Sequence, residues 1–374
     1  MLTVSSGANA ENKIAAADVG FCRLLADRKL SLAVSLVPGG LALIGTAPTG
    51  GLSVEVFPLA GRTADETPTR VWGIAADRNR LVVAGPTEVT IYSNSPLLAA
   101  KHPERAHHYD AFFTPRVSFF TGACMVHDIV IGASNLTVAA TTFSAVCALD
   151  GRYNFDPIWH PRFISAVVPE DRCHLNGIAV EDGVLRYVTA FGAFDAPAGW
   201  RKRPLNQGLL LDVQQDRPLC EGLLVPHSPR LFDGRLMLLE SGNGAVLEVD
   251  RHTGERRTLA QLPGFTRGFV HHDGVLFVGI SRVRPTSEGF PLPVAARHPQ
   301  MLCGIAALDG ATGEVIGMLE FRHGAQEVFD LAILPGIACA GVADLSRPGA
   351  PYLLDSRAGT YWMQPPSPLP PRAT

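Results

Sequence analysis

The sequence predicts an all-β fold: a β-propeller, with seven blades favoured and six as the alternative, and one short helix near the N-terminus. Units made of a short alternating strand, a tight turn and a second strand recur along the chain. Their starts follow one another at roughly 40 to 60 residues, the period of propeller blades. Glycine (37) and proline (29) are spread throughout, as a fold of many short strands and turns requires.

The clearest unit covers residues 172–185. It begins with a polar stretch, continues as a strand, turns at Asp182-Gly183 and returns as a second strand. Asp-Gly between alternating apolar residues is a strong hairpin signal. The same order returns at residues 229–236 and 268–276. Each unit therefore presents polar side chains just where its first strand begins.

Three segments divide the chain. Residues 1–29 are expected to form a leader and the short helix, since apolar residues recur at helical spacing from Ile14 to Leu25. Residues 30–362 are expected to form the propeller domain. Residues 363–374 are dense in proline and are expected to be an extended or disordered tail.

The strands of the propeller begin with an opening run at residues 32–37, 41–45 and 52–57. Six further units follow, and they start at residues 72, 126, 174, 227, 267 and 327. With the opening run this makes seven starts, which favours seven blades. If the opening strands instead complete the blade that the last unit begins, the ring has six blades and no free edge.

Composition argues against several classes of protein. The net charge is −3 and Lys and Arg form no cluster, so neither a nucleic-acid surface nor a polybasic membrane patch is expected. No apolar run approaches the ~20 residues that span a bilayer, and no signal-peptide pattern opens the chain. The seven cysteines form no Cys-x-x-Cys motif and are expected to be reduced and packed. A cytoplasmic protein is therefore expected.

Propeller geometry predicts where the polar stretches meet. The outermost strand of one blade leads into the innermost strand of the next, so residues at this point line the mouth of the central channel. The polar side chains expected there are those of His127, His174, His227, Arg267, Glu327 and Asp330. We expect the fold to bring them together.

Three of these residues, His127, His174 and His227, open three successive units. Neutral imidazole is a good ligand for Zn, Fe, Cu or Ni, and three protein ligands with one open position are typical of a catalytic divalent metal ion. Glu327 or Asp330 is then a further ligand or the general acid/base. The alternative is that the histidines hydrogen-bond backbone groups and close the channel.

Other polar residues of the units are candidates for substrate contacts and for orienting groups. Arg267 and Arg230 would hold an anionic substrate, because a guanidinium pairs with carboxylate or phosphate in bidentate fashion. Asn176 and Asp128 would orient an imidazole, with Asn176 counted among the catalytic candidates and Asp128 among the substrate contacts. Arg172 is a third candidate for the clamp, and buried ion pairing between blades is the alternative for all three arginines.

Cys173 and three tryptophans have structural interpretations beside the chemical ones. Adjacent residues of a strand face opposite sides, so the Cys173 thiol is expected to pack between blades rather than to act as a nucleophile. Trp72, Trp159 and Trp200 either wall a substrate pocket or pack between blades.

Several long motifs resemble the DUF4915 family of bacterial proteins. They lie at residues 157–165, 169–177, 186–190 with 199–201, 226–230, 262–268 and 327–336. The resemblance extends over about residues 20–340; it implies the fold and the importance of these positions, and no reaction. The Asn-Gly-Ile-Ala run at residues 176–179 is also faintly similar to six-bladed lactonase and strictosidine-synthase-like propellers.

Two functions are expected from these observations. The first is a metal-assisted enzyme, whether a lyase, an isomerase or a hydrolase, that acts on a small polar or anionic metabolite in the axial pocket. The alternative is a non-catalytic propeller that serves as a binding module for a protein partner. A bound metal would favour the first function, and strongly apolar exposed faces would favour the second.

Overall fold

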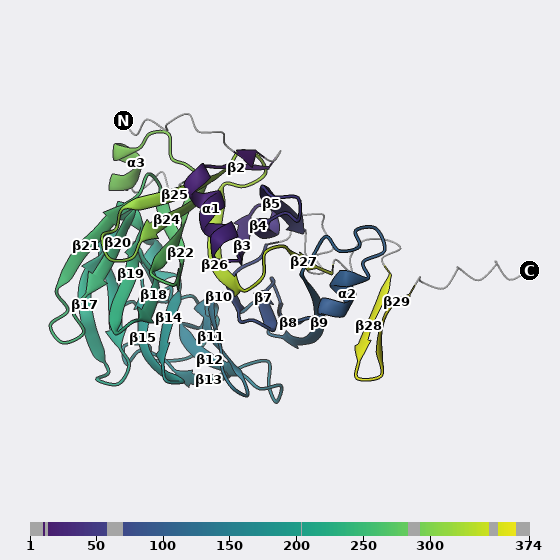
Figure 1. Cartoon of the computed structure of the whole chain (residues 1–374). Coiled ribbons are helices and arrows are strands. Elements are labelled where there is room, and N and C mark those ends of the chain that lie inside the picture. The colour runs from purple at the N-terminus through teal and green to yellow at the C-terminus, as the bar shows by residue number, and fades with distance from the viewer. Residues whose placement is uncertain are drawn as a thin grey trace, which may run out of the picture.

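The structure is a computed structural model that describes residues 10–11, 14–57, 70–202, 204–282, 292–343 and 351–363. Six sheets surround a common axis as the blades of a propeller (Figure 1). The innermost strands are β6 (Ile74–Ala76), β10 (Val126–Ile131), β14 (Gly177–Glu181), β18 (Pro226–Phe232), β22 (Phe265–His272) and β26 (Glu327–Pro335). Each contacts the next, and β26 contacts β6, so the ring is closed.

The strands of a blade pair antiparallel in chain order from the inside outward, as short strands joined by tight turns do. Outside β6 lie β7 (Arg80–Ala84), β8 (Glu88–Asn94) and β9 (Ala111–Phe120), and outside β10 lie β11 (Leu136–Ala140), β12 (Ala145–Leu149) and β13 (Asp156–Trp159). Outside β14 lie β15 (Val184–Ala190), β16 (Gly208–Asp212) and β17 (Arg217–Leu223), and outside β18 lie β19 (Arg235–Glu240), β20 (Ala245–Val249) and β21 (Arg256–Gln261). Outside β22 lie β23 (Val275–Ser281), β24 (Gly304–Asp309) and β25 (Val315–Phe321). Strand β27 (Ala340–Val342) joins the free edge of β9 in parallel.

The closing blade combines both ends of the propeller sequence. Its innermost strand β26 pairs with β3 (Leu30–Val37), which is followed outward by β4 (Gly40–Thr46) and β5 (Leu52–Phe57). The opening run therefore completes the last blade and does not form a seventh. Of the two blade numbers that the sequence allows, six is the one found.

The helix near the N-terminus is present but begins later than the spacing predicts. α1 spans Val19–Asp27, and the carboxylate of Asp18 caps it by accepting a hydrogen bond from the backbone N–H of Phe21 at 2.7 Å. The expected start at Ile14 is wrong, because strand β2 (Ala15–Ala17) pairs with β25 and, together with β1 (Ala10–Glu11), extends that blade. Backbone pairing with the edge of β25 therefore decides the structure of these three residues, although the apolar side chains have helical spacing.

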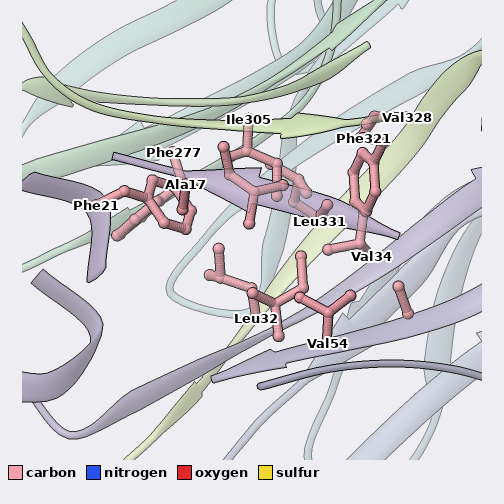
Figure 2. Close-up of a cluster of buried hydrophobic side chains, with 14 of the residues drawn as sticks. Ala17, Phe21, Leu32, Val34, Val54, Phe277, Ile305, Phe321, Val328 and Leu331 are labelled. Carbon is pink, nitrogen blue, oxygen red and sulfur yellow. The ribbon is translucent and has the colours of Figure 1, made fainter. Parts of the chain in front are cut away.

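Side chains from α1 fill the space between the last two blades (Figure 2). Phe21 packs edge-to-face on Phe277 with 6.2 Å between ring centroids. The same buried cluster contains Leu32, Val34 and Ile305. Burying each such side chain contributes about 1.5–3 kcal/mol, so the cluster fastens the closing blade to its neighbour.

A hairpin outside the blades lies beside helix α2 (Pro96–Ala100) at the edge of the molecule (Figure 1). It consists of β28 (Tyr352–Ser356) and β29 (Gly359–Met363). Leu353 and Trp362 face inward, and the indole N–H of Trp362 donates to the carbonyl of Leu98 at 3.0 Å. Its opposite side exposes four apolar side chains, those of Tyr352, Leu354, Tyr361 and Met363. We call these four residues the hairpin patch.

The remaining elements are short. Helix α3 spans Pro293–Arg297, and 3-10 turns occur at Thr141–Phe143, Gly199–Lys202, Leu205–Gln207 and Ser241–Asn243. In the part of the chain that the structure describes, no helix is both long and apolar enough to pass through a bilayer. Of the predicted tail at residues 363–374, all but Met363 lies outside the described residues.

Candidate functional site

Four of the innermost strands carry a β-bulge near the channel mouth. The register slips between Val126 and Ile129, His227 and Arg230, Thr266 and Phe269, and Val328 and Asp330. A bulge adds a residue to one strand and redirects the side chains beside it. Neighbours in sequence, such as His127 and Asp128, therefore contribute to two different layers along the axis.

The first layer is a pocket of about 410 Å³, which we call the mouth pocket. His127, His174, His227, Arg267 and Glu327 all line it, although they span positions 127 to 327 of the chain. Its walls include the aromatic rings of Trp72, Phe191, Trp200, Phe265 and Phe329. Volume and lining are typical of small-molecule sites, which combine apolar walls with a few polar groups.

His127 and His227 are buried and are held through Nδ1. This atom lies 2.9 Å from the carbonyl oxygen of Met125 in His127. In His227 it lies 3.2 Å from the carbonyl oxygen of Val225 and 2.8 Å from the hydroxyl oxygen of Ser241, which can also accept. A carbonyl oxygen only accepts, so Nδ1 carries the proton and donates. Burial, followed by the positive charge of Arg267, holds the pKa of both imidazoles well below the usual range. Both rings are therefore neutral near pH 7, with Nε2 as an acceptor.

His174 is held by a carboxylate instead. Its Nδ1–H donates toward both oxygens of Asp171, at 3.0 and 3.2 Å. Asp171 also accepts from the indole N–H of Trp200 at 3.0 Å, and the guanidinium of Arg201 lies 3.8 Å away. Positive φ angles at Asp171 (46°) and His174 (51°) turn the chain sharply and bring the carboxylate back onto the ring. We call these two residues the Asp171–His174 pair.

The three histidine rings surround the pocket without forming one compact cluster. The rings of His127 and His174 are 5.1 Å apart, but Phe191 lies between His174 and His227, at 4.4 and 5.4 Å from the respective centroids. The described residues contain no group of three or more His, Cys, Asp or Glu side chains arranged to hold a metal ion. The bound metal stays a prediction.

Arg267 lies on β22 and Glu327 on β26, and both line the pocket. The guanidinium carbon of Arg267 lies 3.4 Å from the ring centre of Phe329, a close cation–π contact. Glu327 is buried, at 8% exposure. Both residues are thus in reach of a ligand in the mouth pocket.

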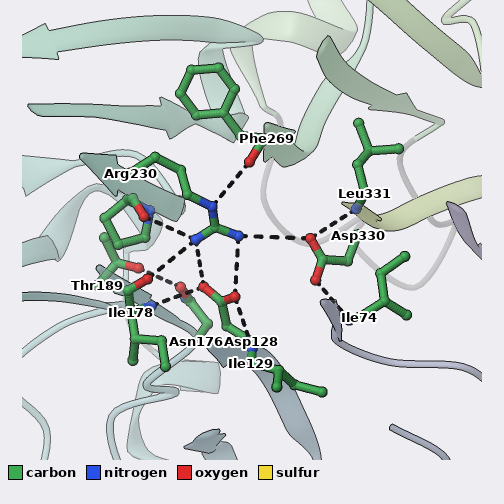
Figure 3. Close-up of polar contacts among 11 residues, drawn as sticks. Ile74, Asp128, Ile129, Asn176, Ile178, Thr189, Arg230, Phe269, Asp330 and Leu331 are labelled. Atoms are coloured by element: carbon green, nitrogen blue, oxygen red, sulfur yellow. Dashed lines mark hydrogen bonds and ion pairs between the residues drawn. The ribbon is translucent and has the colours of Figure 1, made fainter. Parts of the chain in front are cut away.

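The second layer closes the channel beneath the pocket (Figure 3). The guanidinium of Arg230 donates to both oxygens of Asp128, at 2.8 and 3.1 Å, and lies 3.9 Å from Asp330. We call these three residues the axial plug. Beyond it a second hollow of about 450 Å³ opens between the same innermost strands.

The axial plug ties all six innermost strands together. Asp330 accepts from the backbone N–H of Ile74, which links β26 to β6, and Asp128 accepts from that of Ile178, which links β10 to β14. Arg230 of β18 donates to the carbonyl of Phe269 of β22 at 3.0 Å. These bonds span the channel, so the plug closes the ring from inside.

Four predicted site residues therefore lie below the mouth pocket rather than in its lining. Asp128, Arg230 and Asp330 form the plug, and Asn176 donates to the carbonyl of His174 and accepts from Thr189. For Arg230 the sequence allowed either substrate binding or a buried ion pair between blades, and the structure shows the buried ion pair. Asp128, Arg230 and Asp330 lie at the bulges of β10, β18 and β26, which redirect their side chains, whereas Asn176 precedes β14 and is held by its own hydrogen bonds.

Arg172 and Cys173 also lie outside the pocket lining. Arg172 pairs with Glu170 at 2.8 Å and with Asp195 at 2.6 Å. Cys173 is fully buried, and burial raises the pKa of its thiol to about 12, so it packs between blades as expected. Trp159 packs in the cluster that contains Cys173.

Sequence reasoning missed Asp171 as a partner of His174 and the pocket residues Phe191, Arg70, Arg201 and Arg282. All five lie in segments between strands, where no periodicity reports the direction of a side chain. The one available signal was an acidic residue three positions before His174. Asp171 and His174 come into contact at this spacing only because both residues have positive φ angles.

Asp330 is expected to give the stability an identifiable pH dependence. Burial, followed by the negative charge of Asp128, raises the pKa of Asp330 to about 7. Between about pH 4 and pH 7 the folded state then keeps a proton that the unfolded chain releases, so this residue's contribution to stability falls as the pH rises.

The measurement is urea unfolding of the wild type and Asp330→Asn between pH 4 and pH 8. The destabilisation caused by the substitution should shrink toward pH 7, where the wild type has lost this contribution. The difference between the proteins is needed because His127 and His227, with lowered pKa values, change stability in the opposite sense. A difference that does not vary with pH would contradict the raised pKa.

A matching family model and a similar crystal structure support the fold. A family model described as a domain of unknown function, DUF4915, matches residues 19–343. A crystal structure of a nidogen/laminin complex contains a chain that is similar with a TM-score of 0.52 and 12% identity, over 82% of this chain and 99% of that one. A protein of unknown function from Bacteroides caccae is similar with a TM-score of 0.49 and 11% identity, over 81% and 98%. No curated protein matches.

Proposed function

The chain belongs to the DUF4915 family, and from its mouth pocket we propose that it is an enzyme that acts by general acid–base chemistry on a small anionic metabolite. The observation that carries the proposal is the Asp171–His174 pair at the wall of this pocket. Its Nδ1–H is committed to a carboxylate, which leaves Nε2 as the ring nitrogen for a substrate.

In this proposal His174 takes a proton from the substrate or from a water molecule on Nε2. Asp171 keeps the imidazole in the required tautomer and stabilises the imidazolium that forms. Arg267 holds the anionic group of the substrate. The neutral rings of His127 and His227 accept hydrogen bonds from its hydroxyl or amino groups through Nε2. Lyase, isomerase and hydrolase reactions all use such a proton transfer.

The test is consumption of a metabolite by purified protein. A filtered extract of small metabolites is incubated with the wild type and with His174→Gln, and losses and gains are followed by mass spectrometry. We expect at least one anionic component to be consumed by the wild type and not by the variant. Equal profiles with both proteins, each folded by circular dichroism, would contradict the proposal.

Analysis for bound metal distinguishes this mechanism from the metal-assisted one. In the metal-assisted form, Zn, Fe, Cu or Ni would bind to Nε2 of His127, His174 and His227. Elemental analysis of freshly purified protein would then find about one ion, lost in His174→Ala and in His227→Ala. Under the acid–base proposal, turnover continues after treatment with a chelator.

The hairpin patch supports a second candidate, a non-catalytic propeller that binds a protein partner. Tyr352 pairs with Met363 and Leu354 with Tyr361 across the two strands, and each side chain is between 45% and 55% exposed. Clustered exposed apolar side chains mark many protein interfaces. Under this candidate the extract stays unchanged, and Leu354→Asp weakens association while His174→Gln does not.

We also keep the expected cytoplasmic location as part of the proposal. All seven cysteines are free, and six of them are buried. Free thiols in this number are typical of proteins from a reducing compartment.

A further inference from the structure

Three arginines of the mouth pocket lie over aromatic rings within cation–π distance. The guanidinium carbon lies 5.8 Å from the ring centre of Trp72 for Arg70 and 4.3 Å from that of Trp200 for Arg201. Arg267 lies over Phe329 in the same way. A guanidinium in this position can still direct its N–H groups at carboxylate or phosphate oxygens.

The arginines lie at two depths. Arg267 is partly buried on the innermost strand β22. Arg70, Arg201 and Arg282 are exposed, and all three also line the pocket. We call these three residues the rim arginines.

The charges of the pocket are unbalanced. Its lining contains four arginines and one carboxylate, that of Glu327, among the described residues. His127 and His227 add no charge near pH 7, because their pKa values are lowered. Asp171 lies behind the ring of His174 and reaches Arg201 only at 3.8 Å. A concave site with an excess of one sign attracts ligands of the opposite charge.

We infer that the substrate carries two anionic groups, one bound at Arg267 and the other at the rim arginines. The inference rests on the proposed function, since it names the substrate class of the same pocket. A dicarboxylate and a phosphate-bearing carboxylic acid share this chemistry. A pocket of about 410 Å³ accommodates either when the two groups are a few carbon atoms apart.

The experiment compares ligands that carry two anionic groups, here called dianions, with counterparts that carry one. Binding of succinate, butyrate, phosphoglycolate and glycolate is followed by intrinsic tryptophan fluorescence, to which Trp72 and Trp200 of the pocket contribute, at low ionic strength and in a buffer without phosphate. Each dianion should bind about 10- to 100-fold more tightly than its monoanionic counterpart, the difference expected from one charge-assisted contact. Whether succinate or phosphoglycolate binds more tightly distinguishes the two sources.

Variants locate the second anionic group. In Arg70→Gln/Arg201→Gln the dianions should lose about 10-fold in affinity or more, and the monoanions less than about 2-fold. Arg152→Gln, at an exposed arginine outside the pocket, should change neither. Circular dichroism of each variant checks that the fold is unchanged.

Equal affinity for dianions and monoanions, or equal losses for both in the rim variant, would overturn the inference. So would the absence of binding by all four probes. None of these results affects the test of the Asp171–His174 pair, which depends on proton transfer. Conversely, selective dianion binding without any turnover would leave the inference standing and remove the catalytic proposal.

Discussion

Replacing Arg230 with methionine is expected to lower the free energy of unfolding by about 3–5 kcal/mol. The side chain of Arg230 is 21% exposed, whereas those of Asp128 and Asp330 are each only 4% exposed. Methionine fills much of the same space but leaves two carboxylates facing each other without a cation. Removing one partner of a buried ion pair is costly because the remaining charge stays desolvated.

Urea unfolding measures this effect, and its pH dependence identifies the cause. Near pH 5 Asp330 already holds a proton in the folded wild type, because its pKa is raised to about 7. The cost of Arg230→Met should therefore be smaller at pH 5 than at pH 8. Arg152→Met, at an exposed arginine, is the matched control and should cost less than about 0.5 kcal/mol. If Arg230→Met also lowers the free energy of unfolding by less than about 0.5 kcal/mol, the plug does not hold the ring together.

Asp171→Asn is expected to slow turnover by about 10²- to 10⁴-fold with little change in stability. Asp171 accepts from two donors, the Nδ1–H of His174 and the indole N–H of Trp200. An amide has one oxygen and one NH2 group, so one of the two acceptor positions of the carboxylate becomes a donor. If its NH2 group faces His174, Nδ1 becomes the acceptor and the proton moves to Nε2, which is the wrong tautomer for a base.

Trp200→Phe is the matched control for this prediction. It removes the indole N–H and leaves the carboxylate on His174, so turnover should fall far less than in Asp171→Asn. The tautomer is read directly from the ring-nitrogen chemical shifts of His174 by NMR. Unchanged turnover in Asp171→Asn, with Nδ1 still protonated, would remove Asp171 from the mechanism.

Much of the architecture can be read from local patterns. Strand, turn and strand repeat because Asp-Gly turns and alternating apolar residues act within a few positions of one another. The same repetition places each polar stretch at the start of a blade, which is why the prediction that His127, His174 and His227 share one pocket agrees with the structure. The burial of Cys173 likewise depends only on the two-residue period of a strand.

Local patterns in the sequence are thus sufficient to predict the repeated unit, the propeller and the ring of polar residues at its mouth. The tertiary structure decided three further points: that the strands from Leu30 to Phe57 complete the blade of β26, that the bulges send Asp128, Arg230 and Asp330 into the axial plug, and that Asp171 turns back onto His174. Each depends on contacts between segments distant in sequence or on φ angles that most residue types avoid. Patterns between near neighbours carry no information about such contacts.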